Sequence, residues 1–257
     1  MIPQRHKATP ETMRASDTSI RLVYETPTSH SAVETQAFVT QEVERPSKSW
    51  VREVISAERE SEHVRVRTPD FVLLPDQQRR RPSPPMRWKE IDRCFHIHRR
   101  VPDPPLGLCC APPRRLNWLA ITTDPSLRSI RDLRARHVPM LERMQRLCLA
   151  AMQRELGVAE DQIMIFANYP PSVYQLHFHF TVPFAQPSPY DAFRIHPLST
   201  ILNNLRLYPD YYRESTFRIP VHAASDLYAA LCPESSLSPC SSEDDDGGQE
   251  EADGAEK

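Results

Sequence analysis

Apolar and polar residues alternate most regularly over residues 174–183, and this pattern predicts a β-strand. Successive side chains of a strand point to opposite faces, so the stretch has one apolar face and one polar face. The apolar face carries Leu176, Phe178 and Phe180, and the polar face carries Gln175, His177 and His179. We expect the first face to join the core and the second to present two imidazoles, with the Gln175 side chain solvated beside them.

The rest of the chain changes between strand and helix periodicity. Alternating or short apolar runs predict strands over residues 20–24, 64–66, 71–76, 117–122, 162–169 and 215–221. Apolar residues spaced three and four apart predict helices from residue 50 to about 62, from 132 to 157, over 197–207 and over 225–231. A Thr/Ser-rich connection should join residues 25–49. These elements indicate an α+β protein with an antiparallel sheet and flanking helices.

The longest predicted helix has clear signals at both ends. Asp132 is a residue type that caps helix starts, and Gly157 is the type that ends them. Its apolar stripe consists of Leu133, Val138, Leu141, Met144, Cys148, Ala151 and Met152. We expect this stripe, methionines included, to pack into the core rather than to form a cofactor site.

Residues 162–169 and 174–183 are separated by a short turn that contains Pro170 and Pro171. Two strands joined in this way form an antiparallel hairpin. The hairpin should bring Asn168, Ser172 and Arg194 within reach of the histidine face.

Three segments show no such periodicity. Residues 1–19 are polar, and residues 236–257 are acidic, so we expect both to lack fixed structure. Residues 79–115 are rich in proline and arginine and should form an inserted surface loop. Within that loop, His96, His98, Cys109 and Cys110 would suit a metal site, but a solvated basic loop is the simpler interpretation.

Composition limits the possible partners. The chain has 257 residues and a formal net charge of −2, and its last 15 residues hold eight acids and one lysine, so residues 1–242 carry +5. This mild positive charge fits a phosphate-bearing ligand and argues against a general nucleic-acid binder. We find no signal peptide and no run of about 18 apolar residues, which predicts a soluble protein with no membrane partner. The six cysteines show no C-x-x-C pair, so we expect free thiols and no zinc.

The two histidines of the predicted strand are candidate functional groups. Side chains at positions i and i+2 of a strand lie roughly 7 Å apart, so both could contact one phosphate, one carbonyl or one metal ion. Taken alone, the pattern is also compatible with an ordinary solvated polar face.

Several stretches, in this order, resemble the C-terminal part of the scavenger mRNA decapping enzymes, which are members of the histidine-triad superfamily. They are residues 50–60, 71–76 (FVLLPD), 127–133 (LRSIRDL), 174–181 (YQLHFHFT) and 210–212 (DYY). The resemblance covers about residues 20–232 and implies a fold like that of the histidine-triad proteins. On this basis residues 50–235 form the decapping-type domain, and residues 20–49 match a piece of the family's N-terminal region.

The resemblance implies a role for several residues. His177 matches the nucleophile that forms a phosphohistidine, and His179 matches a histidine that contacts phosphate. Ser172 and Arg194 match phosphate-contacting positions. A neutral imidazole can attack phosphorus at neutral pH, and a second histidine can stabilise the transferred group without a metal ion or cofactor.

Three further positions match the site that recognises 7-methylguanine. Trp50 matches the indole that stacks on the cationic base, which is a favourable cation–π partner. Glu60 and Asp76 match the acids that accept hydrogen bonds from the base edge. Each of these residues alone would be read as core or as solvated surface.

The sequence also departs from the family. Gln175 stands where the first triad histidine belongs, Asn168 replaces a histidine near the phosphates, and Gln78 replaces a lysine beside the base. We still place Asn168 and Gln175 in the substrate site, because the first triad position orients the nucleophile with its main-chain carbonyl, which glutamine also supplies. The family's large N-terminal domain, which closes over the ligand, has a counterpart here only in residues 20–49.

Three functions follow from this resemblance. The first is a metal-independent hydrolase that cleaves capped mononucleotides or short capped oligonucleotides and releases 7-methylguanosine monophosphate in 3′-to-5′ mRNA decay. The second is a catalytically impaired paralogue that binds cap or nucleotide and regulates an active partner. The third is a histidine-triad hydrolase with another substrate. The expected partners are a cap dinucleotide or short capped RNA and a second subunit in a homodimer or heterodimer, without DNA, in the cytoplasm and also the nucleus.

Overall fold

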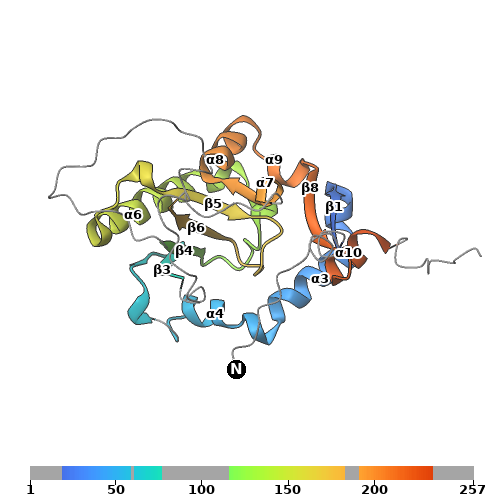
Figure 1. Ribbon diagram of the computed structural model, residues 1–257, viewed down its shortest axis with the longest axis horizontal. Helices are drawn as coiled ribbons and strands as arrows, with labels where there is room; N and C mark the ends of the chain where they lie inside the picture. Colours follow the sequence, from blue (N-terminus) through green and yellow to red (C-terminus); the bar gives the residue numbers. More distant parts are fainter. Residues whose placement is uncertain (1–18, 59–60, 77–115, 183–190, 234–257) are drawn as a thin grey trace, which may run out of the picture.

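The computed structural model describes residues 19–58, 61–76, 116–182 and 191–233, and the account below is limited to them. A six-stranded sheet in the order β2-β3-β4-β6-β5-β7 forms its centre, and every neighbouring pair is antiparallel (Figure 1). The strands are β2 (Val66–Arg67), β3 (Phe71–Pro75), β4 (Asn117–Thr122), β5 (Met164–Asn168), β6 (His177–Thr181) and β7 (Ile195–Pro197). The expected α+β architecture is confirmed, with β4 at its predicted bounds and the histidine strand shorter than predicted.

Helices cover both faces of this sheet. The longer ones are α6 (Val138–Leu156) and α8 (Leu198–Leu207), and a single short helix, α4 (Trp50–Ile55), covers the other face (Figure 1). Strand β3 shows the consequence, because Phe71 and Leu73 belong to the large core under α6 and α8, whereas Val72 and Leu74 belong to a small core under α4. A strand covered on both faces is apolar throughout, which explains the unbroken Phe-Val-Leu-Leu run.

The predicted stripe of α6 is confirmed over most of its length. Five of its residues are fully or almost fully buried, namely Leu141, Met144, Cys148, Ala151 and Met152. Gly157 follows the helix with a φ of 67°, a backbone conformation that glycine adopts without steric cost.

The predicted start of this helix was wrong. Asp132 does not cap α6, which begins at Val138, but ends a 3-10 turn over Ile130–Asp132. Its carboxylate accepts hydrogen bonds from the backbone N–H groups of Arg128 and Ser129, at 2.8 and 2.9 Å. The Asp132 carboxylate therefore caps the short turn and is already used when α6 begins six residues later.

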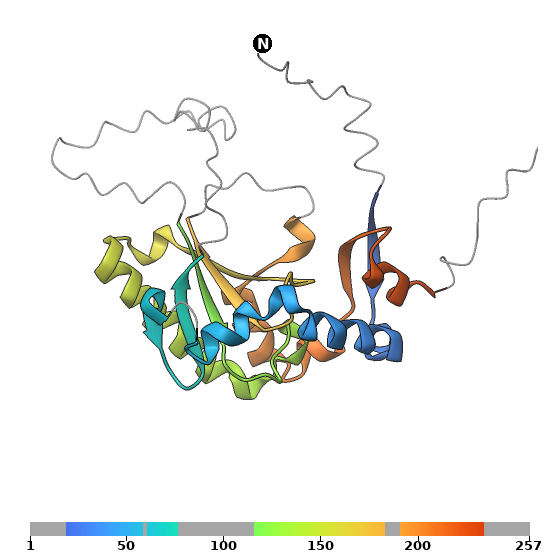
Figure 2. The ribbon, with the colours of Figure 1, turned by 90° about the horizontal axis from the view of Figure 1, so that it is seen from below.

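Residues 20–49 contain more structure than the predicted connection. Strand β1 (Ile20–Glu25) pairs antiparallel with β8 (Phe217–His222), and helices α2 (Pro27–Ser31) and α3 (Val33–Glu44) follow. The Thr and Ser residues that suggested a loop act as caps, since the side chains of Thr26 and Ser29 each accept a hydrogen bond from the other's backbone N–H. Helix α3 lies beside α10 (Asp226–Leu231), next to the β1–β8 ribbon (Figure 2).

A buried ion pair fastens this ribbon to the large core. Arg131 and Glu25 are both about 2% exposed, and the Arg131 guanidinium donates to Glu25 Oε2 from Nε at 3.1 Å and from Nη2 at 2.7 Å. The Tyr169 hydroxyl donates to the same oxygen at 2.5 Å, and the guanidinium carbon lies 4.1 Å from the centre of the Phe217 ring. Burial alone would raise the pKa of Glu25, but its hydrogen bond with His30 and the charge of Arg131 lower it overall, so the buried carboxyl stays ionised.

The remaining described elements are short helices and 3-10 turns in the connections between the elements above. They are the helices α7 (Asp191–Arg194) and α9 (Tyr211–Glu214) and the 3-10 turns η1 (Pro46–Lys48), η2 (Ser61–His63), η4 (Ala135–His137) and η5 (Glu160–Gln162). No helix in the described ranges is long and apolar enough to cross a membrane. The predicted insertion at 79–115, most of residues 1–19 and the acidic tail lie outside those ranges.

Candidate active site

A pocket of about 260 Å³ opens on the face of the sheet that α4 covers. Helix α4 contributes two of its residues, β4 and β6 contribute two each, and the others follow β3 or lie in the β5–β6 turn. The lining residues are Trp50, Val51, Asp76, Leu119, Ile121, Ser172, Val173, His177 and His179. The structure thus brings together five of the nine predicted site residues, from segments up to 129 positions apart in the sequence.

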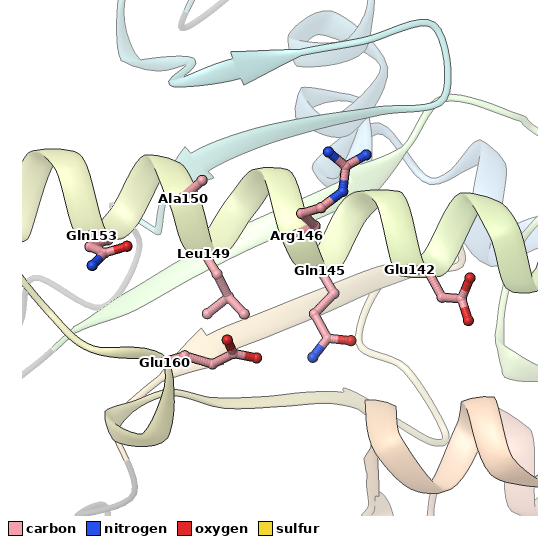
Figure 3. A pocket seen from close by; sticks show the side chains of 7 residues that line it. All are labelled: Glu142, Gln145, Arg146, Leu149, Ala150, Gln153 and Glu160. Carbon is pink, nitrogen blue, oxygen red and sulfur yellow. The ribbon is translucent and has the colours of Figure 1, made fainter.

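A second hollow, of about 320 Å³, lies along the outer side of α6 (Figure 3). It is lined by Glu142, Gln145, Arg146, Leu149, Ala150 and Gln153 of that helix and by Glu160 of η5 (Figure 3). None of the predicted site residues reaches it, so the smaller pocket is the candidate active site.

The backbone just before β6 fixes the orientation and tautomer of His177. Its Nδ1 lies 2.7 Å from the main-chain carbonyl oxygen of Gln175. A carbonyl oxygen only accepts, so Nδ1 carries the proton and Nε2 of the neutral ring keeps its lone pair. Burial lowers the pKa of His177, and the charge of Lys48 lowers it further, against the opposing effects of the Gln175 carbonyl and Asp76. The imidazole is therefore neutral near pH 7, the form in which it can act as a nucleophile.

His179 lies deeper and is held between two asparagines. Its Nε2 is 3.2 Å from Asn168 Nδ2, and its Nδ1 is 3.4 Å from Asn117 Oδ1. Asn117 Nδ2 in turn donates to Asp76 Oδ2 at 2.7 Å. Because a carboxylate only accepts, this last bond fixes which end of the Asn117 amide faces His179, and the ring therefore donates from Nδ1 and accepts at Nε2. A polar chain thus runs from Asp76 through Asn117 and His179 to Asn168.

The histidine face is less polar than the alternation predicted. His179 is only 9% exposed, and its ring stacks on Phe166 with 5.0 Å between ring centres. Beside it, Leu119 and Ile121 of β4 are almost fully buried in the small core under α4. The reason is that α4 covers this face, so the two imidazoles stand at the edge of an apolar layer rather than on a solvated surface.

Gln175 does not extend into solvent as predicted. Its side-chain Nε2 donates to the carbonyl oxygens of Thr122 and Asp124, at 2.7 and 2.9 Å. The amide thus closes the loop that follows β4, and the main-chain carbonyl is the part of Gln175 that contacts His177.

Trp50 is the first residue of α4, and it packs against the small core while it also lines the pocket. Asp76 directly follows β3, and its backbone N–H donates to the Asn117 carbonyl at 2.9 Å. The aromatic ring and the carboxylate therefore line the same pocket as the two histidines.

Four predicted residues do not line this pocket: Asn168 and Gln175 contact its histidines from outside, and Arg194 and Glu60 do not reach it within the described structure. Arg194 ends α7, and its carbonyl accepts a hydrogen bond from the Tyr169 N–H at 2.8 Å, next to Asn168, but it does not line the pocket. Glu60 lies outside the described residues.

Sequence reasoning missed two residues that the structure brings to the site. Asn117 begins a buried strand, and the sequence gave no signal except that a polar amide precedes an apolar run. Lys48 donates from its Nζ to the carbonyl of Ser172, and its position two residues before Trp50 was the available signal. Within the described ranges, no group of three or more His, Cys, Asp or Glu lies where it could hold a metal ion.

Comparisons with known proteins agree with this geometry. Residues 109–190, which include β4 to β6 and both histidines, match the family model described as scavenger mRNA decapping enzyme C-term binding. The m7GpppX diphosphatase of Bos taurus is 27% identical over 189 residues, which make up 72% of this chain and 48% of that protein. The m7GpppX diphosphatase of Ascaris suum is 30% identical over 171 residues, or 61% of this chain and 56% of that protein.

The enzyme of the same name from Schizosaccharomyces pombe is 28% identical over 164 residues, or 62% of this chain and 43% of that protein. The chain spans about half the length of these curated relatives. Residues 109–190 therefore match the C-terminal domain of the scavenger mRNA decapping enzymes, and the chain is similar over a longer range to the m7GpppX diphosphatases.

Proposed function

We propose that this chain hydrolyses the triphosphate bridge of 7-methylguanosine-capped nucleotides or short capped oligonucleotides. The observation that carries the proposal is the His177 tautomer, because the Gln175 carbonyl accepts a hydrogen bond from Nδ1–H and leaves the Nε2 lone pair as a nucleophile in the pocket that Trp50 and Asp76 also line. The names of the relatives, m7GpppX diphosphatase, support the same chemistry.

In the proposed reaction, the Nε2 lone pair of His177 attacks the phosphorus next to 7-methylguanosine. The bond from this phosphorus to the bridging oxygen breaks, and the oxygen leaves with its electron pair on the nucleoside diphosphate or shortened RNA. Water then attacks the same phosphorus, which breaks the N–P bond and releases 7-methylguanosine monophosphate. His179 would stabilise the charge on the transferred group in its protonated form, in which Nε2 also carries a proton and donates a hydrogen bond.

One assay tests the proposal. The purified protein is incubated with a 7-methylguanosine cap dinucleotide in the presence of EDTA, and the products are identified by mass. We expect 7-methylguanosine monophosphate and a nucleoside diphosphate. Any other cleavage position would contradict attack at the phosphorus next to the methylated nucleoside.

A binding and regulatory role is the second candidate. The observation that favours it is the side chain of Gln175, which donates hydrogen bonds to the carbonyls of Thr122 and Asp124. The first triad position therefore places no titratable group beside His177 that could assist catalysis. Tight cap binding without product in the same assay would support this role, and the size of the complex would show whether a second subunit takes part.

Base recognition is tested at Trp50. Replacing Trp50 with alanine should weaken the binding of 7-methylated caps by about 1–2 kcal/mol, since a cationic base loses its aromatic partner. Unmethylated guanosine nucleotides should lose much less, because they carry no such charge. Titration of both ligands against parent and variant measures the difference, and equal losses would mean that Trp50 only supports the fold.

The variant Gln175→His tests whether the first triad position acts through its backbone. We expect the turnover rate to change by no more than about tenfold, or about 1.4 kcal/mol of barrier, because His177 keeps its carbonyl partner. The free energy of unfolding should fall by about 1 kcal/mol. The Gln175 amide donates hydrogen bonds to the carbonyls of Thr122 and Asp124, whereas a neutral imidazole has one N–H and can keep only one of the two. Single-turnover kinetics and urea unfolding measure the two effects. A gain in rate of a hundredfold would show that the missing imidazole matters and would favour the regulatory role.

A further inference from the structure

Among the described residues, no lysine or arginine lines the candidate pocket for the ligand proposed above. Its described lining residues include one carboxylate, one hydroxyl and two histidines, and the others are apolar or aromatic, without lysine or arginine among them. A triphosphate bridge carries several negative charges, and ammonium or guanidinium groups are the side chains that usually balance them. Binding of such a ligand would therefore be favoured by a positively charged side chain near the rim of the pocket.

Lys48 lies at this rim. It ends the 3-10 turn η1, two residues before Trp50, and its Nζ donates to the carbonyl oxygen of Ser172, which lines the pocket. Its charge also acts on His177, so the ammonium group is within electrostatic reach of the imidazole. Lys48 is thus adjacent in sequence to Trp50 and in contact with the Ser172 side of the pocket.

The neighbouring charges leave the Lys48 ammonium available to a ligand. Glu42 of α3 lies 3.8 Å from Lys48 Nζ, but the same carboxylate lies 2.6 Å from the Arg45 guanidinium. The Glu42 charge is therefore balanced mainly by Arg45. The hydrogen-bond partner of Lys48 at the pocket is a neutral carbonyl, and a hydrogen bond to a charged phosphate oxygen is stronger than one to a neutral acceptor.

We propose that Lys48 is a phosphate-binding residue, whose Nζ contacts the phosphate bridge of the bound nucleotide at the Ser172 side of the pocket. An ammonium group has three N–H donors, so Lys48 can bind a phosphate oxygen while it keeps a bond to Ser172. This assignment rests on the proposed function, and it adds a contribution from the turn between α3 and α4 to the ligand site.

Calorimetric titration of the full chain at low ionic strength tests the assignment, with 7-methylguanosine and its 5′-triphosphate as ligands. Lys48→Met should weaken binding of the triphosphate about tenfold, or about 1.4 kcal/mol, and binding of the nucleoside less than about twofold. Lys48→Arg should retain most of the affinity for the triphosphate. Arg154→Met is the control, since it removes the same charge from a 70% exposed side chain that does not line the pocket, and it should change the binding of both ligands less than about twofold.

The outcomes separate this assignment from the proposed function. Equal effects of Lys48→Met on nucleoside and triphosphate would overturn the assignment, as would a parent protein that gains no affinity from the triphosphate. A parent that gains affinity, loses it in Lys48→Met and yet cleaves no cap dinucleotide would contradict the proposed hydrolysis and support the Lys48 contact.

Discussion

Replacing His177 with asparagine should abolish turnover of a cap dinucleotide and leave its binding nearly unchanged. The amide nitrogen of asparagine has no lone pair available to attack phosphorus, so the covalent step has no nucleophile. We expect the rate to fall at least about a thousandfold, which corresponds to about 4 kcal/mol of barrier. The dissociation constant should stay within about threefold of the parent, because the lost interaction is one that forms mainly in the transition state.

Single-turnover kinetics and a binding titration together measure this separation. His63→Asn is the matched control, since it makes the same substitution at a histidine with a 38% exposed side chain outside the pocket. Acid-labile mass on the peptide that contains His177, present in the quenched parent and absent in the variant, would identify the phosphohistidine directly. Turnover of His177→Asn within tenfold of the parent would exclude His177 as the nucleophile.

Arg131→Met should destabilise the protein by about 3–5 kcal/mol, the range measured when one partner of a buried ion pair is removed. The side chains of Arg131 and Glu25 are 1% and 2% exposed, so the carboxylate would stay buried without its cation. The same guanidinium donates from Nη1 to the carbonyl oxygens of Tyr212 and Ser215, at 3.1 and 2.5 Å, and both would lose that bond. Urea unfolding followed by circular dichroism gives the free energy of unfolding.

Two further variants show whether burial is the cause. Arg206→Met breaks the pair between Arg206 and Glu142, whose side chains are 55% and 47% exposed, and should cost less than about 1 kcal/mol. Adding Glu25→Leu to Arg131→Met should recover part of the lost stability, because no unpaired charge then remains in the core. A cost below about 1 kcal/mol for Arg131→Met would mean that water reaches the pair.

The pattern of side chains predicted the central elements because burial imposes a period on each of them. Strand β4 was recognisable at its full length since both of its faces are covered, and the α6 stripe was recognisable since one face packs on the large core. The pattern was less informative where polar side chains bond to the nearby backbone. Asp132 caps a 3-10 turn that we had assigned to a longer helix, and Thr26 caps the short helix α2 in a segment that we had assigned to a loop.

The candidate site was predicted residue by residue but not as a network. The motifs led to His177, His179, Trp50, Asp76 and Ser172, which the fold gathers in one pocket. The contacts that tune these groups depend on pairings across the sheet. Asn117 and His179 meet because their strands are neighbours, a relation that neither local sequence contains.

The Arg131–Glu25 pair also connects residues inside the segment that matches the decapping family to residues outside it. Residues 109–190, which match the decapping family, include Arg131. They do not include the acceptors of its hydrogen bonds, which are the Glu25 carboxylate and the carbonyls of Tyr212 and Ser215. The matched segment also lacks β3, the partner of β4 in the sheet. We therefore expect the segment that folds cooperatively to be longer than the segment recognised by sequence similarity and to extend at least from Ile20 to His222.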